Sequence, residues 1–320
     1  MFTVSNGHGA VDLGSVAPLS LISDKVSDKR CRHPKGTTLR VESHGATRSP
    51  SPAVDNTDWL KAAGIVLVSA DHFGYFFMED ELWWSAFGRL AAPIFFFLLG
   101  FAQTRAVPLH WIWLGVVLTL LESWNADWTW VAPNILLSLA LIRIARPYVQ
   151  ILVQRKGWAG FFLVVCALLV VLPITSNIVD YGSEGWLWAL CGLCQRMYVD
   201  GRLVVDARGA AQNSAPLVRT TTENVGLMRL VACVVAAVVY VWQEQREYLF
   251  PTFQLAVLIL GIGALSVILC LFHRGPSRIQ TPAAIAGFLR FIGRHTLEIY
   301  AIQLAGSELL SSKLVLDLAP

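Results

Sequence analysis

Charged residues are scarce in this chain. They make up 15% of its 320 residues, whereas an ordinary soluble domain carries about 25%. Hydrophobic residues make up 55%, so a soluble fold of this length would not have enough polar residues for its surface. The composition therefore excludes a soluble enzyme, a disordered regulator and a disulfide-stapled secreted module. The apolar residues form continuous runs rather than alternating patterns, which predicts an all-α integral membrane protein.

Cysteine and short catalytic motifs are also poorly represented. Cys191 and Cys194 have the spacing of a metal-binding pair, but no second pair and no nearby histidine complete a site. The chain has no phosphate-binding glycine loop, no nucleophile elbow and no zinc-protease motif. Basic residues flank the apolar runs instead of forming a patch. We therefore expect no metal and no nucleic-acid partner.

Residues 1–58 lack any apolar run long enough for a secretory signal peptide. Their polar, mixed composition predicts a disordered cytoplasmic tail. A start codon assigned too far upstream would account for the same stretch equally well. The transmembrane domain is then expected over residues 59–320, with a cytoplasmic loop at 199–224.

Apolar runs with short polar breaks follow from Trp59 onward. Most approach the roughly 20 residues that cross a hydrocarbon core of about 30 Å. We expect a polytopic transmembrane helical bundle of about nine helices, and eight to ten would fit the pattern. The expected segments are 59–78, 84–103, 107–123, 130–146, 158–175, 184–198, 225–243, 251–272 and 288–310.

Lysine and arginine divide unevenly between the two sets of loops. Of the 25 in the chain, only Arg89, Arg246 and Lys313 fall on the side opposite the N-terminal tail. The positive-inside rule then places the N-terminus in the cytoplasm and the C-terminus outside a cell membrane, most simply a bacterial inner membrane. Tryptophans near the boundaries fit aromatic belts. Those expected near the outer boundary are Trp83, Trp84, Trp124, Trp128, Trp130, Trp186, Trp188 and Trp242.

Ionisable residues within the apolar segments are candidates for chemistry, because charge at membrane depth is costly and usually functional. The first segment contains Asp71 and His72, more than ten residues from Trp59. At about 1.5 Å per residue they lie beyond the midplane, toward the outer side. They form a candidate acid–base unit, although neighbours on a helix point about 100° apart. A structural histidine satisfied by another helix is the alternative.

The second segment opens with Gly88 and Arg89, followed by Pro93. We expect Arg89 at a height close to His72, with Pro93 bending the helix beside it. Arg89 then pairs with Asp71 or stabilises a developing negative charge. A side chain reaching to the membrane interface is the alternative.

The last segment contains Arg290, Arg294, His295 and Glu298. Three of them follow i, i+4 spacing, which predicts a charged stripe along one helix face. The two arginines lie at the expected cytoplasmic mouth, where a phosphorylated ligand would enter. Glu298 is expected deeper, paired with Arg294 or His295. A basic helix end with one internal ion pair explains the stripe equally well.

Two stretches resemble a known family. The sequence D-W-L-K-A-A-G-I-V-L-V-S-A-D-H-F-G-Y-F-F, followed by G-R-L-A-A-P-I-F-F-F-L-L-G-F, is similar to the opening helical hairpin of the TraX family. Those polytopic proteins are linked to N-terminal acetylation of conjugative pilin. The closing F-I-G-R-H-T-L-E-I-Y resembles the last-helix signature of a wider group of transmembrane acyltransferases.

The resemblance implies an integral membrane acyltransferase that takes acetyl-CoA or another acyl-CoA from the cytoplasm. Its acceptor would be an amine or hydroxyl on a protein N-terminus, a sugar or another small molecule. Carried over by position, Asp71 and His72 would be the catalytic pair, and Gly88 and Arg89 the supporting motif. Neutral His72 would take the acceptor proton, and Arg89 would steady the oxyanion. Guanidinium groups would bind the CoA phosphates; the candidates are Arg105, Arg290 and Arg294.

Two other classes of function use the same residues. In a transporter or channel, the ionisable residues of the bundle would form a proton or substrate pathway. The chain shows no internal repeat of the kind that many transporters carry. A non-catalytic partner in a secretion or conjugation machine is the third possibility. Binding or hydrolysis of acetyl-CoA separates the enzyme from the other two.

Overall fold

The computed structural model describes residues 54–78, 81–104, 106–128, 131–209, 215–277 and 279–311. For residues 202–209, 215–222 and 311 it describes the backbone alone. Residues 1–53 of the expected tail, Arg105 and residues 210–214 of the expected loop lie outside the described residues.

The described ranges fold into α-helices joined by short connections, and their β-structure is limited to one isolated bridge between Asp55 and Pro276. The prediction of an all-α bundle is confirmed. The helices are α1 (Asn56–Phe77), α2 (Leu82–Gly88), α3 (Ala91–Phe101), α4 (Leu109–Asn125), α5 (Ile135–Lys156), α6 (Trp158–Thr175), α7 (Gly182–Gly209), α8 (Ala215–Tyr248), α9 (Thr252–Leu271), α10 (Ala283–Arg294) and α11 (Thr296–Ser311).

Five segments of the described chain are long and apolar enough to cross a membrane. One of them joins α2 and α3 across a single turn at Arg89 and Leu90. The chain is therefore a polytopic transmembrane bundle, as its composition predicts. The five segments are Leu82–Phe101, Ile135–Lys156, Trp158–Thr175, Glu223–Tyr248 and Thr252–Leu271.

Two boundaries differ from the sequence-based expectation. Residues 199–209 and 215–224 were expected in a loop, but they extend α7 and α8. An ion pair between Arg196 and Asp200, at 2.9 Å one turn apart, favours the continued helix. The single helix expected over 288–310 is also wrong, because the chain breaks at His295 between α10 and α11.

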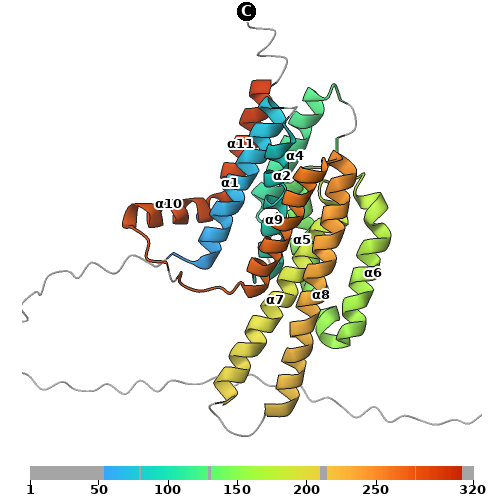
Figure 1. Cartoon of the computed structure of the whole chain (residues 1–320), viewed down its shortest axis with the longest axis vertical. Coiled ribbons are helices and arrows are strands. Elements are labelled where there is room, and N and C mark those ends of the chain that lie inside the picture. Colours follow the sequence, from blue (N-terminus) through green and yellow to red (C-terminus); the bar gives the residue numbers. More distant parts are fainter. Residues whose placement is uncertain are drawn as a thin grey trace, which may run out of the picture. The chain divides into compact units, whose positions relative to one another are not determined.

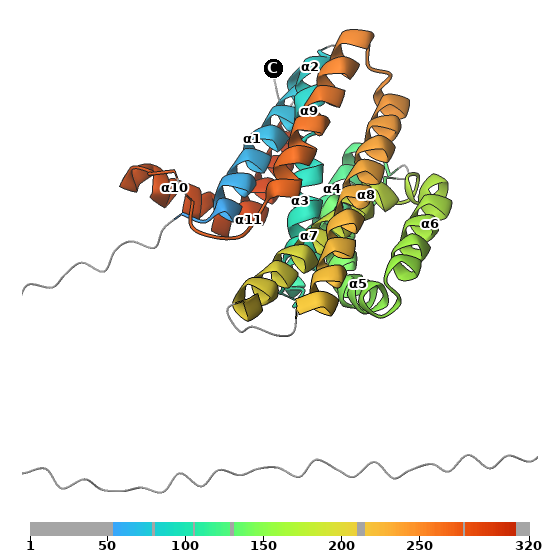
Figure 2. The same ribbon diagram turned by 60° about the horizontal axis from the view of Figure 1, so that its bottom comes forward.

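The start of α1, the end of α7 and the start of α8 lie toward one side of the bundle, with α7 and α8 projecting beyond α1, and we call this side the basic end (Figures 1 and 2). The junction of α1 with α2 and the last turn of α11 lie at the opposite end, which we call the acidic end. This arrangement agrees with the sides expected for these segments relative to one another. The orientation of the bundle in the membrane stays a prediction.

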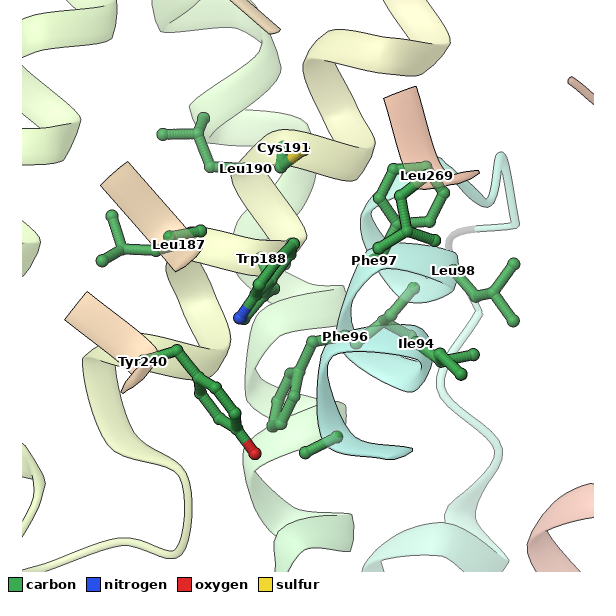
Figure 3. Packing of buried hydrophobic residues seen from close by; sticks show 14 of the residues in the cluster. Ile94, Phe96, Phe97, Leu98, Leu187, Trp188, Leu190, Cys191, Tyr240 and Leu269 are labelled. Carbon is green, nitrogen blue, oxygen red and sulfur yellow. The ribbon is translucent and has the colours of Figure 1, made fainter. Parts of the chain in front are cut away.

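The core lies where α3 packs against α7, with α8 beside α7. Figure 3 shows Phe96, Phe97 and Trp188 in this core, with Tyr240 next to them. Gly100 faces the Ala189 carbonyl with no room for a Cβ, so the two backbones can approach closely. The expectation that Trp188 belongs to an aromatic belt is wrong, because it is fully buried between helices.

Candidate functional site

The break between α2 and α3 leaves one backbone carbonyl, that of Arg89, without a hydrogen-bond donor from the helix. Pro93 lies in the first turn of α3 and has no N–H to donate to the carbonyl four residues earlier. The Tyr240 hydroxyl of α8 donates to this carbonyl instead, at 2.6 Å. The expected bend beside Arg89 is therefore present, and a tyrosine from a distant helix satisfies the group that the proline leaves unpaired.

The Arg89 side chain is held by four groups from three parts of the chain: α1, the turn between α6 and α7, and α8. Its Nη2 lies 3.4 Å from Asp71 Oδ2 of α1, and its Nε lies 3.7 Å from Glu244 Oε2 of α8. Its Nη1 donates to the Tyr181 hydroxyl at 2.7 Å. The guanidinium carbon also lies 4.4 Å from the ring centroid of Tyr248, a cation–π distance. The interfacial reading of Arg89 is wrong, because the side chain is buried in this network.

Gly88 lets α2 approach α1 at the level of Asp71. A Cβ at Gly88 would collide with the Asp71 side chain and backbone. The absence of a side chain at this position is what brings the neighbouring Arg89 within reach of the Asp71 carboxylate. The expected pairing of Asp71 with Arg89 is confirmed, and Gly88 has a steric role in it.

His72 points to a different neighbour. Its ring centroid lies 5.6 Å from that of Tyr300 in α11 and 6.3 Å from that of Phe76. Its Nδ1 is buried and makes no hydrogen bond to any described group. Asp71 therefore pairs with Arg89, and the structure shows no direct bond between Asp71 and His72.

Asp71, His72, Gly88 and Arg89 all line one cavity of about 1190 Å³. It lies at the acidic end, between α1, α2, the last turn of α4, the start of α5 and α11. Arg89 is its only lysine or arginine among the described lining residues. Its lining carboxylates are Asp71, Glu81, Glu122, Asp127, Asp180, Glu247 and Glu308.

Polar pairs fix part of the wall of the cavity. Asn134 Nδ2 donates to Glu122 at 2.9 Å, which joins α5 to α4. Asn125 donates to Glu308, which joins α4 to α11. In the turn between α6 and α7, burial raises the pKa of Asp180 to about 6. The wall is therefore rich in carboxyl groups, and burial shifts the pKa of at least one of them upward.

The remaining candidate residues lie away from this cavity. Arg290 and Arg294 are on α10, and neither lines the cavity. His295 is the C-cap of α10, and its backbone carbonyl accepts from Ile299 at the start of α11. Glu298 is exposed, so the expectation of a buried Glu298 is wrong. The break at His295 interrupts the predicted stripe, because i, i+4 neighbours align only on a continuous helix.

The D-W-L-K stretch has a structural explanation at the basic end. Asp58 completes a capping box with Asp55 at the start of α1. Lys61 donates to the Gly293 carbonyl at 2.7 Å, and a Cβ at Gly293 would collide with Asp58. The opening and closing motifs of the resemblance therefore meet here, although they are more than 200 residues apart in the sequence.

Several residues around Arg89 were not identified as site residues from the sequence. Tyr181, Glu244 and Tyr248 contact its side chain, and Tyr240 contacts its backbone. The sequence shows acidic residues at one end of the apolar segments, but they indicate only the orientation of the chain in the membrane. The tyrosines carry no sequence signal, because a tyrosine near a membrane boundary is usual.

A family model described as TraX protein matches residues 56–262, roughly two thirds of the chain. The match covers α1 to the middle of α9 and includes Asp71, His72 and Arg89, but it ends before α10. No curated protein and no solved structure matches the chain. The chain belongs to the TraX family, and it is a multi-pass membrane protein of this conjugation-associated family.

Proposed function

We propose that the protein is a membrane acyltransferase that moves an acyl group, most simply acetyl, from acyl-CoA to an amine. The observation that carries the proposal is the convergence of His72, Asp71 and Arg89 on one cavity between membrane helices. An imidazole and a guanidinium at one cavity provide a proton acceptor and a cation for a developing oxyanion. The family resemblance supplies the reaction class.

The residues divide the chemistry between them. His72 is the general base, and its location against Tyr300 and Phe76 keeps water from one side of the ring. Arg89 stabilises the charge that develops on the carbonyl oxygen of the donor. Asp71, Tyr181 and Glu244 hold its guanidinium at the cavity, so their role is positioning.

The acceptor follows from the charge of the cavity. Seven lining carboxylates face one arginine, which favours a cation such as a protonated amine over a neutral hydroxyl. The ammonium first loses one proton to a cavity carboxylate or water. Its nitrogen then attacks the thioester carbon while His72 takes a second proton, the C–S bond breaks, and the imidazolium protonates the departing sulfur.

The donor nucleotide does not suit the same surface. Its phosphates would face the lining carboxylates, so they are expected at the basic end, with only the thioester arm reaching His72. The phosphate contacts that the family resemblance implies are Arg105, Arg290 and Arg294. Arg105 lies outside the described residues, and the other two are tested below.

Transfer from labelled acetyl-CoA to a peptide amine tests the proposal, with purified full-length protein in detergent. Loss of general-base help reduces rates by about 10²–10⁴-fold, so His72→Ala should retain less than about one per cent of the transfer rate. Donor binding should change little. His110→Ala is the matched control, because His110 is exposed on α4 outside the cavity lining.

Three results would count against the proposal. Full transfer by a folded His72→Ala protein would remove the general base. Equal loss in the His110→Ala control would point to a general effect of the substitution. A wild-type protein that is indifferent to acetyl-CoA but moves a cation across proteoliposomes would favour transport, which the acid-lined cavity also suits.

A further inference from the structure

Helix α10 does not span the membrane. It has 12 residues, so at about 1.5 Å per residue it is roughly 18 Å long, short of a core of about 30 Å. Figure 1 shows it lying crosswise to α1 and α11 at the basic end of the bundle. A short helix in this orientation lies along a membrane surface rather than through it.

The position of α10 is fixed at both of its ends. Before it, Arg274 and the Gly275 backbone bind the Asp55 carboxylate, each at 3.2 Å. After it, Lys61 binds the Gly293 carbonyl. The helix is therefore held against the first turns of α1, and its outward faces have a defined orientation.

Three faces of α10 have different characters. Leu289, Ile292 and Gly293 are buried against α1. Ile285, Phe288 and Phe291 follow i, i+3 spacing and are 49%, 62% and 56% exposed. Arg290 and Arg294 are one turn apart and occupy the remaining arc, next to the exposed apolar face.

We propose that α10 is an in-plane helix that binds anionic phospholipid at the membrane surface. The apolar arc of Ile285, Phe288 and Phe291 would enter the boundary between headgroups and acyl chains. Arg290 and Arg294 would bind the lipid phosphates, since guanidinium and phosphate form charge-assisted hydrogen bonds. The apolar and basic arcs together complement one partner, a lipid with an anionic head and acyl chains.

The family resemblance implies the same arginines as contacts of the coenzyme A phosphates. A guanidinium binds a lipid phosphate and a nucleotide phosphate by the same hydrogen bonds. We commit to the lipid because a water-soluble nucleotide leaves the exposed apolar arc without a partner. The cavity lining also does not reach α10. The proposal rests on the geometry of α10 and is independent of the acyltransferase reaction.

The first test uses a photo-crosslinking residue. Benzoylphenylalanine replaces Phe288 in the full-length protein, reconstituted in nanodiscs that contain phosphatidylglycerol and phosphatidylcholine. We expect phospholipid adducts by mass spectrometry, as at Leu260 of α9, which is 72% exposed on an apolar membrane segment. An absence of lipid adducts at 288, with adducts at 260, would overturn the proposal.

The second test measures lipid selectivity in the same nanodiscs. Each surface arginine contributes about 1 kcal/mol to binding anionic lipid, which is about fivefold. Arg294 is exposed and Arg290 is half-buried, so replacing both by Gln should reduce the enrichment of phosphatidylglycerol around the protein roughly fivefold or more. Arg155 and Lys156, exposed at the end of α5, provide the matched double control.

Coenzyme A distinguishes the two sources of phosphate. An undiminished enrichment in the Arg290/Arg294 variant would overturn the proposal, as would an equal loss in the Arg155/Lys156 control. Displacement of the lipid by coenzyme A in the wild type would also contradict the proposal, because it would show that these arginines bind the phosphates of the acyl donor. Circular dichroism checks that each variant is folded, and the crosslink at 288 needs no change of charge.

Discussion

The two ends of the bundle both carry arginines, but they use them differently. At the acidic end Arg89 is buried among carboxylates and tyrosines from several helices. At the basic end Arg294 is exposed on α10. A buried cation whose partners are removed is strongly destabilising, whereas an exposed one contributes little. The comparison indicates that charge is part of the fold at one end and available to a partner at the other.

The largest expected effect is at the buried arginine. Arg89→Ala leaves Asp71 and Glu244 without their shared cation, and breaking a buried ion pair costs about 3–5 kcal/mol. Thermal unfolding in detergent should show a large drop in Tm. Arg294→Ala is the control, and its Tm should stay close to that of the wild type. Equal Tm values for the two variants would remove the contrast between the ends.

The second effect is steric and concerns the contact between α1 and α2. Gly88→Ala introduces a Cβ against Asp71, and overpacking of this kind costs about 1–3 kcal/mol. Gly287→Ala on α10 is the matched control, because its Cβ would meet open space. Unfolding midpoints of the two variants give the comparison. A neutral Gly88→Ala would show that the two helices separate easily at this level.

An effect of the same order is expected from the hydrogen bond at the helix break. Tyr240→Phe removes the donor to the Arg89 carbonyl and leaves a buried acceptor unsatisfied, which costs about 1–3 kcal/mol. The exposed Tyr148→Phe on α5 is the control, with no expected change. If Tyr240→Phe also unfolds like the wild type, another group must satisfy that carbonyl.

The smallest effect is a change in pH dependence. The pKa of Asp180 is raised by burial to about 6, from an ordinary value near 3.8, so the folded state favours its neutral form. Its contribution to stability is present below the ordinary value and is lost as pH rises through about 6. Asp180→Asn should therefore unfold at a higher temperature than the wild type at pH 7, and the difference should shrink at pH 4. A difference that grows at low pH would contradict this reading.

Much of the fold could be predicted because apolar periodicity and loop charge are local properties. The expected segments coincide with the helices at α1, α6 and α9 to within a few residues. The break at His295 could not be predicted, since it depends on the contact of Gly293 with Asp58 and Lys61, more than 200 residues away. The extension of α7 was missed because Arg and Asp on its last turns also suit a loop.

The site was partly predictable for a similar reason. Asp71, His72 and Arg89 could be singled out because ionisable residues are rare in apolar segments. The partners of Arg89 on α8 could not be singled out, because Tyr240 and Glu244 reach Arg89 only when α8 packs beside it in the folded chain. The role of Gly88 also depends on a neighbour that the sequence does not place.

Helix α8 contacts Arg89 at two points. Tyr240 donates to its backbone carbonyl, and Glu244, one turn further on, lies near its guanidinium. A shift of α8 would therefore carry the backbone and the side chain of Arg89 together as one body. Among the described residues, His72 has no such contact with α8, and its ring packs against Tyr300 of α11 instead. The distance between the proposed base and the proposed cation then depends on how closely α1 and α2 approach each other, which the ion pair of Asp71 with Arg89 and the contact of Gly88 with Asp71 set together.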